Sequence, residues 1–159
     1  MLKLQNKEIG FQEVPNHTSL CLSVGGCPYH CDGCHSPWLW EDKGEPLLYT
    51  IDKILDKYKK LIECVCFMGG DQEEEELQIL LRKTKEEGLK TCLYTGRNEL
   101  SSFKHETLLL LDWIKIGEYN KELGGLRSPT TNQKFFRLEN GEVVQEIKFY
   151  KEKLLSSSI

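Results

Sequence analysis

Three cysteines close together near the start of the chain are the residues best suited to chemistry. Cys27, Cys31 and Cys34 follow the spacing Cys-x3-Cys-x2-Cys, and no fourth cysteine lies nearby. A [4Fe-4S] cluster that only passes electrons takes four protein ligands. Three ligands leave one iron open, as catalytic zinc sites keep one position open for water or substrate. The spacing therefore predicts a [4Fe-4S] cluster with one iron that binds a further molecule.

A structural zinc site is the alternative for the same loop, with His30 or His35 as the fourth ligand. Short zinc modules usually contain two Cys-x2-Cys pairs, and the second pair is absent, so the spacing favours iron and sulfur. The remaining cysteines lie in apolar stretches and are interpreted as small core residues. They are Cys21, Cys64, Cys66 and Cys92.

Length and composition suit one domain with one core over residues 1–159, with 39% hydrophobic and 29% charged residues. The net charge of -4 and the lack of a basic stripe argue against binding of nucleic acid. The longest apolar stretch, around Leu108 to Leu111, is too short to span a bilayer, and residues 1–6 lack the apolar core of a signal peptide. We expect a cytoplasmic protein without membrane contact, in which clustered cysteines stay reduced and bind metal.

Strand and helix patterns alternate along the middle of the chain, which implies parallel strands joined by right-handed crossovers. There are too few units for a complete eight-stranded barrel of about 250 residues. We therefore expect an α/β fold, namely an incomplete TIM-type barrel of parallel strands with crossover helices and a C-terminal β-hairpin. The expected strands are 18–24, 64–68, 90–95 and 113–116. One expected helix begins after Thr50, a second ends before Gly88, and a third covers 104–111. Residues 124–133 are expected as a loop, and a hairpin turns at Asn140-Gly141.

Two motifs directly follow expected strands. In Gly69-Gly70-Asp71, the glycines allow a close backbone approach to a ligand, and the carboxylate can accept from an ammonium group. The alternative is a tight turn with Asp71 as a helix N-cap. Thr95-Gly96-Arg97 offers backbone contacts and a partner for a carboxylate, or simply a strand end with a surface arginine. Because the C-terminal ends of parallel strands meet at one edge, both motifs should lie near the cysteine loop.

Lys115 is a charged residue inside an otherwise apolar strand. A buried lysine is costly unless it is paired. Lys115 therefore either faces a cavity at the strand ends and holds a carboxylate there, or lies on an edge strand and faces solvent.

These motifs together resemble a known family. The run from Gly26 to His35 (GCPYHCDGCH), then Gly69-Gly70-Asp71 and Tyr94-Thr95-Gly96, resembles the activating proteins of anaerobic ribonucleoside-triphosphate reductases, which are small radical S-adenosylmethionine (SAM) enzymes. The run 122–133 (ELGGLRSPTTNQ) is similar to the tail of a subset of them, and the likeness covers roughly residues 12–145. Glycine at position 33 and aspartate at position 71 depart from the wider superfamily but are common in reductase activases.

The resemblance implies a single radical SAM domain over residues 1–159, with two cofactors. A [4Fe-4S] cluster would be held by Cys27, Cys31 and Cys34, and its open iron would chelate SAM. The other implied SAM contacts are Gly33, Gly69, Gly70, Asp71, Thr95, Gly96, Arg97 and Lys115.

The resemblance also implies the reaction and the partners. An electron donor such as flavodoxin or ferredoxin reduces the cluster, and SAM is cleaved to methionine and a 5'-deoxyadenosyl radical. The radical takes a hydrogen atom from a glycine of the partner, the glycyl-radical subunit of an anaerobic ribonucleoside-triphosphate reductase. Trp38 and Trp40 are candidates for contact with that partner or for core packing.

Three other functions remain open from the residues alone. One is a radical SAM enzyme that acts on a small molecule, and another is a zinc-binding interaction module. The third is an electron-transfer ferredoxin, which the missing fourth cysteine disfavours.

Overall fold

The computed structural model describes residues 1–27 and 41–150. In these residues one mixed sheet has the strand order β3-β1-β2-β4-β5-β6-β7-β8. The strands are β1 (Lys3–Gly10), β2 (Ser19–Val24), β3 (Glu45–Pro46), β4 (Cys64–Met68), β5 (Lys90–Tyr94), β6 (Trp113–Ile116), β7 (Lys134–Glu139) and β8 (Glu142–Ile147). The helices are α1 (Leu47–Tyr58), α2 (Glu74–Glu86) and α3 (His105–Leu109), with 3-10 turns η2 (Asp71–Glu73) and η3 (Leu100–Ser102).

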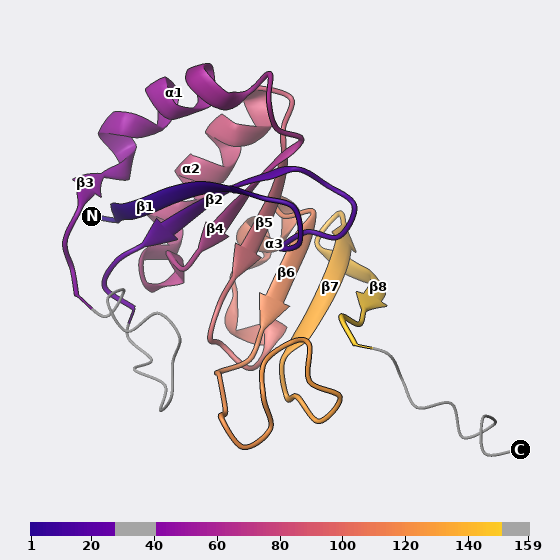
Figure 1. The fold of residues 1–159 in the computed structure, drawn as a ribbon. Helices are drawn as coiled ribbons and strands as arrows, with labels where there is room; N and C mark the ends of the chain where they lie inside the picture. Colours follow the sequence, from indigo (N-terminus) through magenta and orange to yellow (C-terminus); the bar gives the residue numbers. More distant parts are fainter. Residues whose placement is uncertain (28–40, 151–159) are drawn as a thin grey trace, which may run out of the picture.

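Strands β2, β4, β5 and β6 are parallel neighbours, and α1, α2 and α3 lie in the connections between them (Figure 1). Antiparallel strands flank this group: β1 and β3 on one side, and the β7–β8 hairpin on the other. The α/β class, the parallel strands with crossover helices and the C-terminal hairpin are thus confirmed. The sheet is open, with β3 and β8 at its edges. Its description as part of a TIM-type barrel stays a prediction.

The two faces of the sheet differ in what covers them. Leu20, Val65 and Phe67 point to the side of α1 and α2 and are fully buried in the main core, which contains apolar residues of both helices. Alternate residues of the same strands point the other way, because side chains alternate along a strand. We call this second side the cysteine face; its buried cluster is Val14, Cys21, Cys64, Cys66, Cys92, Trp113 and Phe135.

Three cysteines form a row across the cysteine face. Cys21 lies opposite Cys66 in the β2–β4 pair, and Cys66 lies opposite Cys92 in the β4–β5 pair. The Cys66 thiol also lies 3.5 Å from the Met68 sulfur. Burial raises the pKa values of Cys66 and Cys92, so both thiols keep their protons at neutral pH. These cysteines are small core residues, as their apolar sequence context predicts.

Helix α1 begins earlier than the sequence suggested. Pro46 occupies the N-cap position in an extended conformation (φ -60°, ψ 119°), and the helix starts at Leu47. The expectation that the helix begins after Thr50, with Thr50 as its N-cap, is therefore wrong. Its hydroxyl instead donates to the Pro46 carbonyl at 3.2 Å from within the first turn. A proline suits a helix start because its φ is already near the helical value and it lacks an N–H.

Strand β1 has no strong apolar pattern and was not expected from the sequence. Most of its side chains are exposed or half-buried. It is a strand because its backbone pairs with β2 between Leu4 and Gly10, which gives hydrogen-bond partners to the N–H and C=O groups of β1 that face β2.

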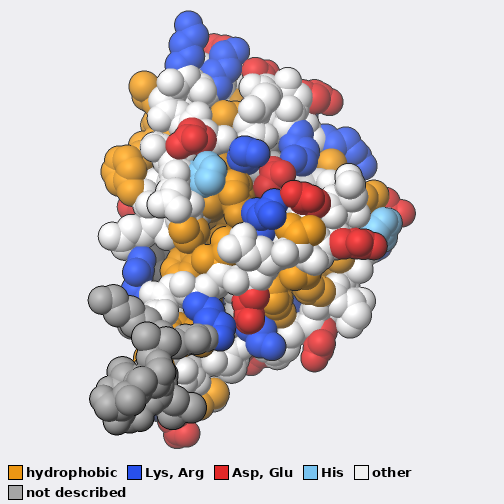
Figure 2. Space-filling view, turned by 90° about the vertical axis from the view of Figure 1, so that its right-hand side faces the viewer, with side chains coloured by type: hydrophobic (Ala, Val, Ile, Leu, Met, Phe, Trp, Pro, Cys, Tyr) orange, Lys and Arg blue, Asp and Glu red, His pale blue; other side chains and the backbone are white. Residues whose placement is uncertain are grey.

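The molecular surface mixes charges of both signs. Figure 2 shows Lys and Arg side chains intermixed with Asp and Glu on the side of the molecule that carries the β7–β8 hairpin. In the described part of the chain, no helix is long and apolar enough to cross a membrane.

The buried Cys64 thiol makes the fold sensitive to alkaline pH. Burial raises the pKa of Cys64 from 9.0 to about 11. Between these values the unfolded chain releases this proton and the folded chain keeps it, so stability falls as pH rises from 9 to 11. We expect wild type to lose about 1 kcal/mol more stability per pH unit in this window than Cys64→Ala. Anaerobic urea unfolding at pH 8, 9, 10 and 11 measures the difference. Parallel pH dependences of the two proteins above pH 9 would contradict it.

Candidate functional site

The chemistry-bearing motifs meet at one edge of the sheet, beyond the C-terminal ends of the parallel strands (Figure 1). Cys27, which is half-buried, follows β2, and Gly69-Gly70-Asp71 follows β4. Thr95-Gly96-Arg97 begins directly after β5, and Gly117 directly follows β6. The convergence that the sequence predicted is therefore present for these residues. Cys31, Cys34 and Gly33, with Trp38 and Trp40, lie outside the described residues.

Gln72 links the turn after β4 to the segment that leads into Cys27. The Gly70 N–H donates to Oε1 of Gln72 at 3.1 Å, and Nε2 of Gln72 donates to the Gly25 carbonyl at 2.9 Å. Gly69 and Gly70 have φ values of 97° and 114°, in the left-handed region that favours glycine. Sequence reasoning missed Gln72, although its place directly after Gly-Gly-Asp was a usable signal.

Asp71 and Arg97 join the second and third loops. The Asp71 residue is 3% exposed, and its Oδ2 accepts from Nε of Arg97 at 3.1 Å. The same guanidinium donates to the Asp71 and Ser102 carbonyls at 2.7 and 2.8 Å, and it stacks on Phe103. Asp71 belongs to η2, whose N-cap is Gly70, so the N-cap role for Asp71 is wrong. The expected roles of Asp71 and Arg97 towards a bound ligand stay predictions.

Thr95 and Lys115 hold the next two strand ends together. The Thr95 N–H donates to the Lys115 carbonyl at 2.9 Å, and the Thr95 hydroxyl accepts from the Arg97 N–H at 3.1 Å. Lys115 is 9% exposed on β6, which pairs with both β5 and β7, so the edge-strand alternative is wrong. Its ammonium donates to the Gly117 carbonyl at 3.1 Å and lies 5.8 Å from the Tyr94 ring centroid.

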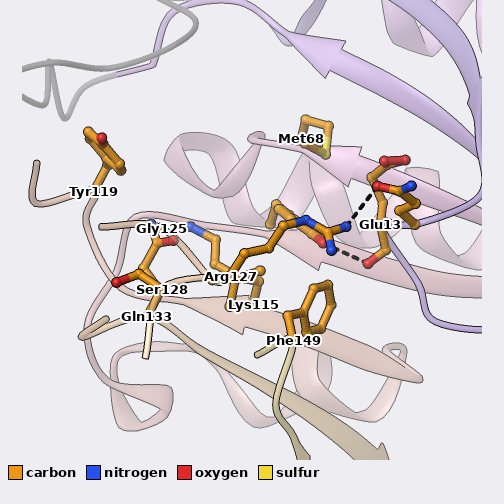
Figure 3. A pocket seen from close by; sticks show the side chains of 12 residues that line it. Glu13, Met68, Lys115, Tyr119, Gly125, Arg127, Ser128, Gln133 and Phe149 are labelled. Carbon is orange, nitrogen blue, oxygen red and sulfur yellow. Dashed lines mark hydrogen bonds between the residues drawn. The ribbon is translucent and has the colours of Figure 1, made fainter. Parts of the chain in front are cut away.

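A cavity of about 610 Å³ opens beside these strand ends (Figure 3). Its walls come from the strand ends Met68, Tyr94 and Lys115, from residues 12–13, from the loop between β6 and β7, and from Phe149. The Tyr94 hydroxyl donates to the Glu13 carbonyl at 2.6 Å, which fixes the segment before β2 over the cavity. Burial raises the pKa of Tyr94, so its phenol stays protonated and uncharged.

Sequence reasoning placed Lys115 at a cavity and missed most of the other walls. The segment around Gln12 and Glu13, and Phe149 near the other end of the chain, come together only through tertiary packing. The loop 124–133 was expected as a loop, and its residues 125–128 and Gln133 line the cavity. The Gln133 amide donates to the Gly117 carbonyl, which Lys115 also contacts.

A model of the 4Fe-4S single cluster domain matches residues 17–136. The chain belongs to this family. No curated protein and no solved structure matches the chain. The match covers the cysteine loop and every strand-end motif described above. Membership in the 4Fe-4S single cluster family supports an iron–sulfur cluster as the cofactor and counts against zinc.

The Asp71–Arg97 pair should be a major contributor to stability. Loss of Arg97 leaves the Asp71 carboxylate buried without this guanidinium, whereas loss of Asp71 leaves an Arg97 that is partly exposed and still paired with Glu74. We expect Arg97→Met to lower the free energy of unfolding by about 3 kcal/mol, Asp71→Asn to lower it by less, and the double variant to lower it by less than the sum of the two. Urea unfolding measures all three.

The matched control is Arg137→Gln, which removes an exposed pair with Glu139 and should change stability by less than about 1 kcal/mol. Strictly additive losses in the double variant would argue against coupling between Asp71 and Arg97.

Proposed function

We propose that this protein is a radical SAM activase that generates a glycyl radical on an anaerobic ribonucleotide reductase. The observation that carries the proposal is the Cys-x3-Cys-x2-Cys loop in a chain of the 4Fe-4S single cluster family. Three thiolates leave one iron of a [4Fe-4S] cluster open, which electron transfer alone does not require.

The other four cysteines support a three-thiolate ligand set. Cys21, Cys64, Cys66 and Cys92 are between 0% and 4% exposed within the sheet. Ser19 Oγ lies 2.9 Å from the Cys64 thiol, and Met68 contacts Cys66. A hydrogen bond with Cys66, together with burial, raises the pKa of Cys21, and burial raises the pKa of Cys64, Cys66 and Cys92. The thiolate form that binds iron is therefore disfavoured at all four.

In this proposal Cys27, Cys31 and Cys34 hold the cluster. When bound, the reduced cluster would supply the electron that cleaves SAM to methionine and a 5'-deoxyadenosyl radical, which takes a hydrogen atom from a partner glycine. The donor of that electron would be a protein such as flavodoxin or ferredoxin in the cytoplasm.

The neighbouring residues of this chain would position the SAM molecule. Gly69 and Gly70 bring the backbone at positive φ close to Gly25, which leads into the cysteine motif, and Gln72 links Gly70 to Gly25. Lys115 places a buried positive charge on the cavity wall, which suits a carboxylate. The cavity lies at the same strand ends and would shield a reactive species from water.

A small-molecule substrate is the second candidate, and the cavity itself favours it. A volume of about 610 Å³ falls in the range of sites that enclose drug-sized ligands. The two candidates differ in what receives the radical: a glycine of a large protein, or a molecule held inside the cavity.

Cluster and SAM chemistry can be tested directly. The protein is reconstituted anaerobically with iron and sulfide, reduced with dithionite and mixed with SAM. We expect four irons per chain, a changed electron paramagnetic resonance signal on SAM addition, and formation of 5'-deoxyadenosine. Addition of an anaerobic ribonucleotide reductase should then give a glycyl radical signal.

Single alanine variants of Cys27, Cys31 and Cys34 should each abolish 5'-deoxyadenosine formation, whereas Cys92→Ala, in the core row, should retain it. A Cys31→Ala variant with the wild-type rate would rule out the ligand set. SAM cleavage without any glycyl radical on the reductase would favour the small-molecule candidate.

A further inference from the structure

Two of the three charged residues that line the cavity are positive, although the whole chain carries a net charge of -4. The charged residues in its lining are Glu13, Lys115 and Arg127. The Glu13 carboxylate lies beside Gly10, and the Glu13 carbonyl accepts from the Tyr94 hydroxyl. The cavity therefore presents two cations, Lys115 and Arg127 (Figure 3).

Arg127 has no carboxylate partner among residues 1–27 and 41–150. Its Nη2 donates to Oε1 of Gln12 at 2.8 Å, and its guanidinium lies 5.8 Å from the Phe149 ring centroid. Both neighbours are neutral. Arg97 and Arg137, by contrast, each pair with carboxylates. A guanidinium that makes one neutral side-chain bond keeps donors for a bidentate carboxylate.

The two cations lie at different depths. Lys115 is buried in the central part of the sheet, whereas Arg127 is exposed on the loop between β6 and β7. A small anion would need only one of these positions. An extended polypeptide can reach the strand ends near Lys115 and still carry a side chain past the exposed guanidinium. Loss of the Gln12 contact would cost little, because a charged acceptor forms the stronger hydrogen bond to arginine.

From this charge distribution, and resting on the proposed function, we infer that Arg127 is a docking residue for an acidic side chain of the partner segment that brings the glycine into the cavity. The carboxylate replaces the Gln12 amide on the guanidinium. Such a contact selects segments with Asp or Glu near the glycine and disfavours those with Lys or Arg.

The test uses the full chain with its cluster reconstituted and SAM present, and it measures binding of synthetic peptides by fluorescence anisotropy. The peptides share a central glycine, and a single Asp, Asn or Lys is moved through each flanking position. We expect one position at which wild type prefers Asp over Asn by about tenfold, with a smaller preference at high salt. Arg127→Gln should lose this preference, and Arg127→Glu should prefer Lys at the same position.

Arg137→Gln is the matched control, because it removes an arginine that does not line the cavity, and it should keep the Asp preference. Equal binding of Asp and Asn peptides by wild type at every position would overturn the inference. An unchanged Asp preference in Arg127→Gln would also overturn the inference. If that variant in addition bound SAM more weakly, the guanidinium would be assigned to SAM binding. Failure of the proposed function is a separate outcome, seen as no 5'-deoxyadenosine from wild type without any peptide.

Discussion

The structure depends on the parallel pairing of β2, β4, β5 and β6, because this pairing directs four successive loops to one edge of the sheet. A parallel connection must return across the sheet before the next strand begins, so each strand ends on the same side. Residues separated by many positions, such as Cys27, Asp71 and Arg97, therefore share one edge. Hydrogen bonds of Gln72 and Arg97 then lock the loops to each other.

The two faces of the sheet are covered by different kinds of side chain. Helices α1 and α2 cover one face with large aliphatic side chains, which supply most of the apolar burial. The cysteine face carries thiols and aromatic rings and no helix residue in its buried cluster. Residues 12–13 and the loop between β6 and β7 enclose a cavity at the strand ends, next to Met68 and Tyr94, which pack against this cluster. The cavity thus lies on the face of the sheet that the helices do not cover.

Much of the central fold could be predicted from the sequence, because apolar runs such as Cys64–Met68 and Trp113–Ile116 are buried on both faces and leave a continuous signal. The hairpin at Asn140-Gly141 was equally predictable, since both residues have the positive φ that its turn requires. Strand β1 was not, because its pairing with β2 is a property of the backbone and its side chains are mostly exposed.

The candidate site was predictable only where a motif directly follows a strand. Glycines after β4 and a charged residue within β6 carry their signal locally. The structure places Gly69 and Gly70 at the end of β4, and Lys115 on the cavity wall. The partners of these residues carry none: nothing near Asp71 in the sequence indicates that Arg97 neutralises it. The same holds at the mouth of the cavity, where Gln12 and Arg127 meet across 115 positions of sequence. A neutral amide is a weaker partner for a guanidinium than a carboxylate, so the proposed docking of an acidic side chain would replace the Gln12 contact with a stronger one.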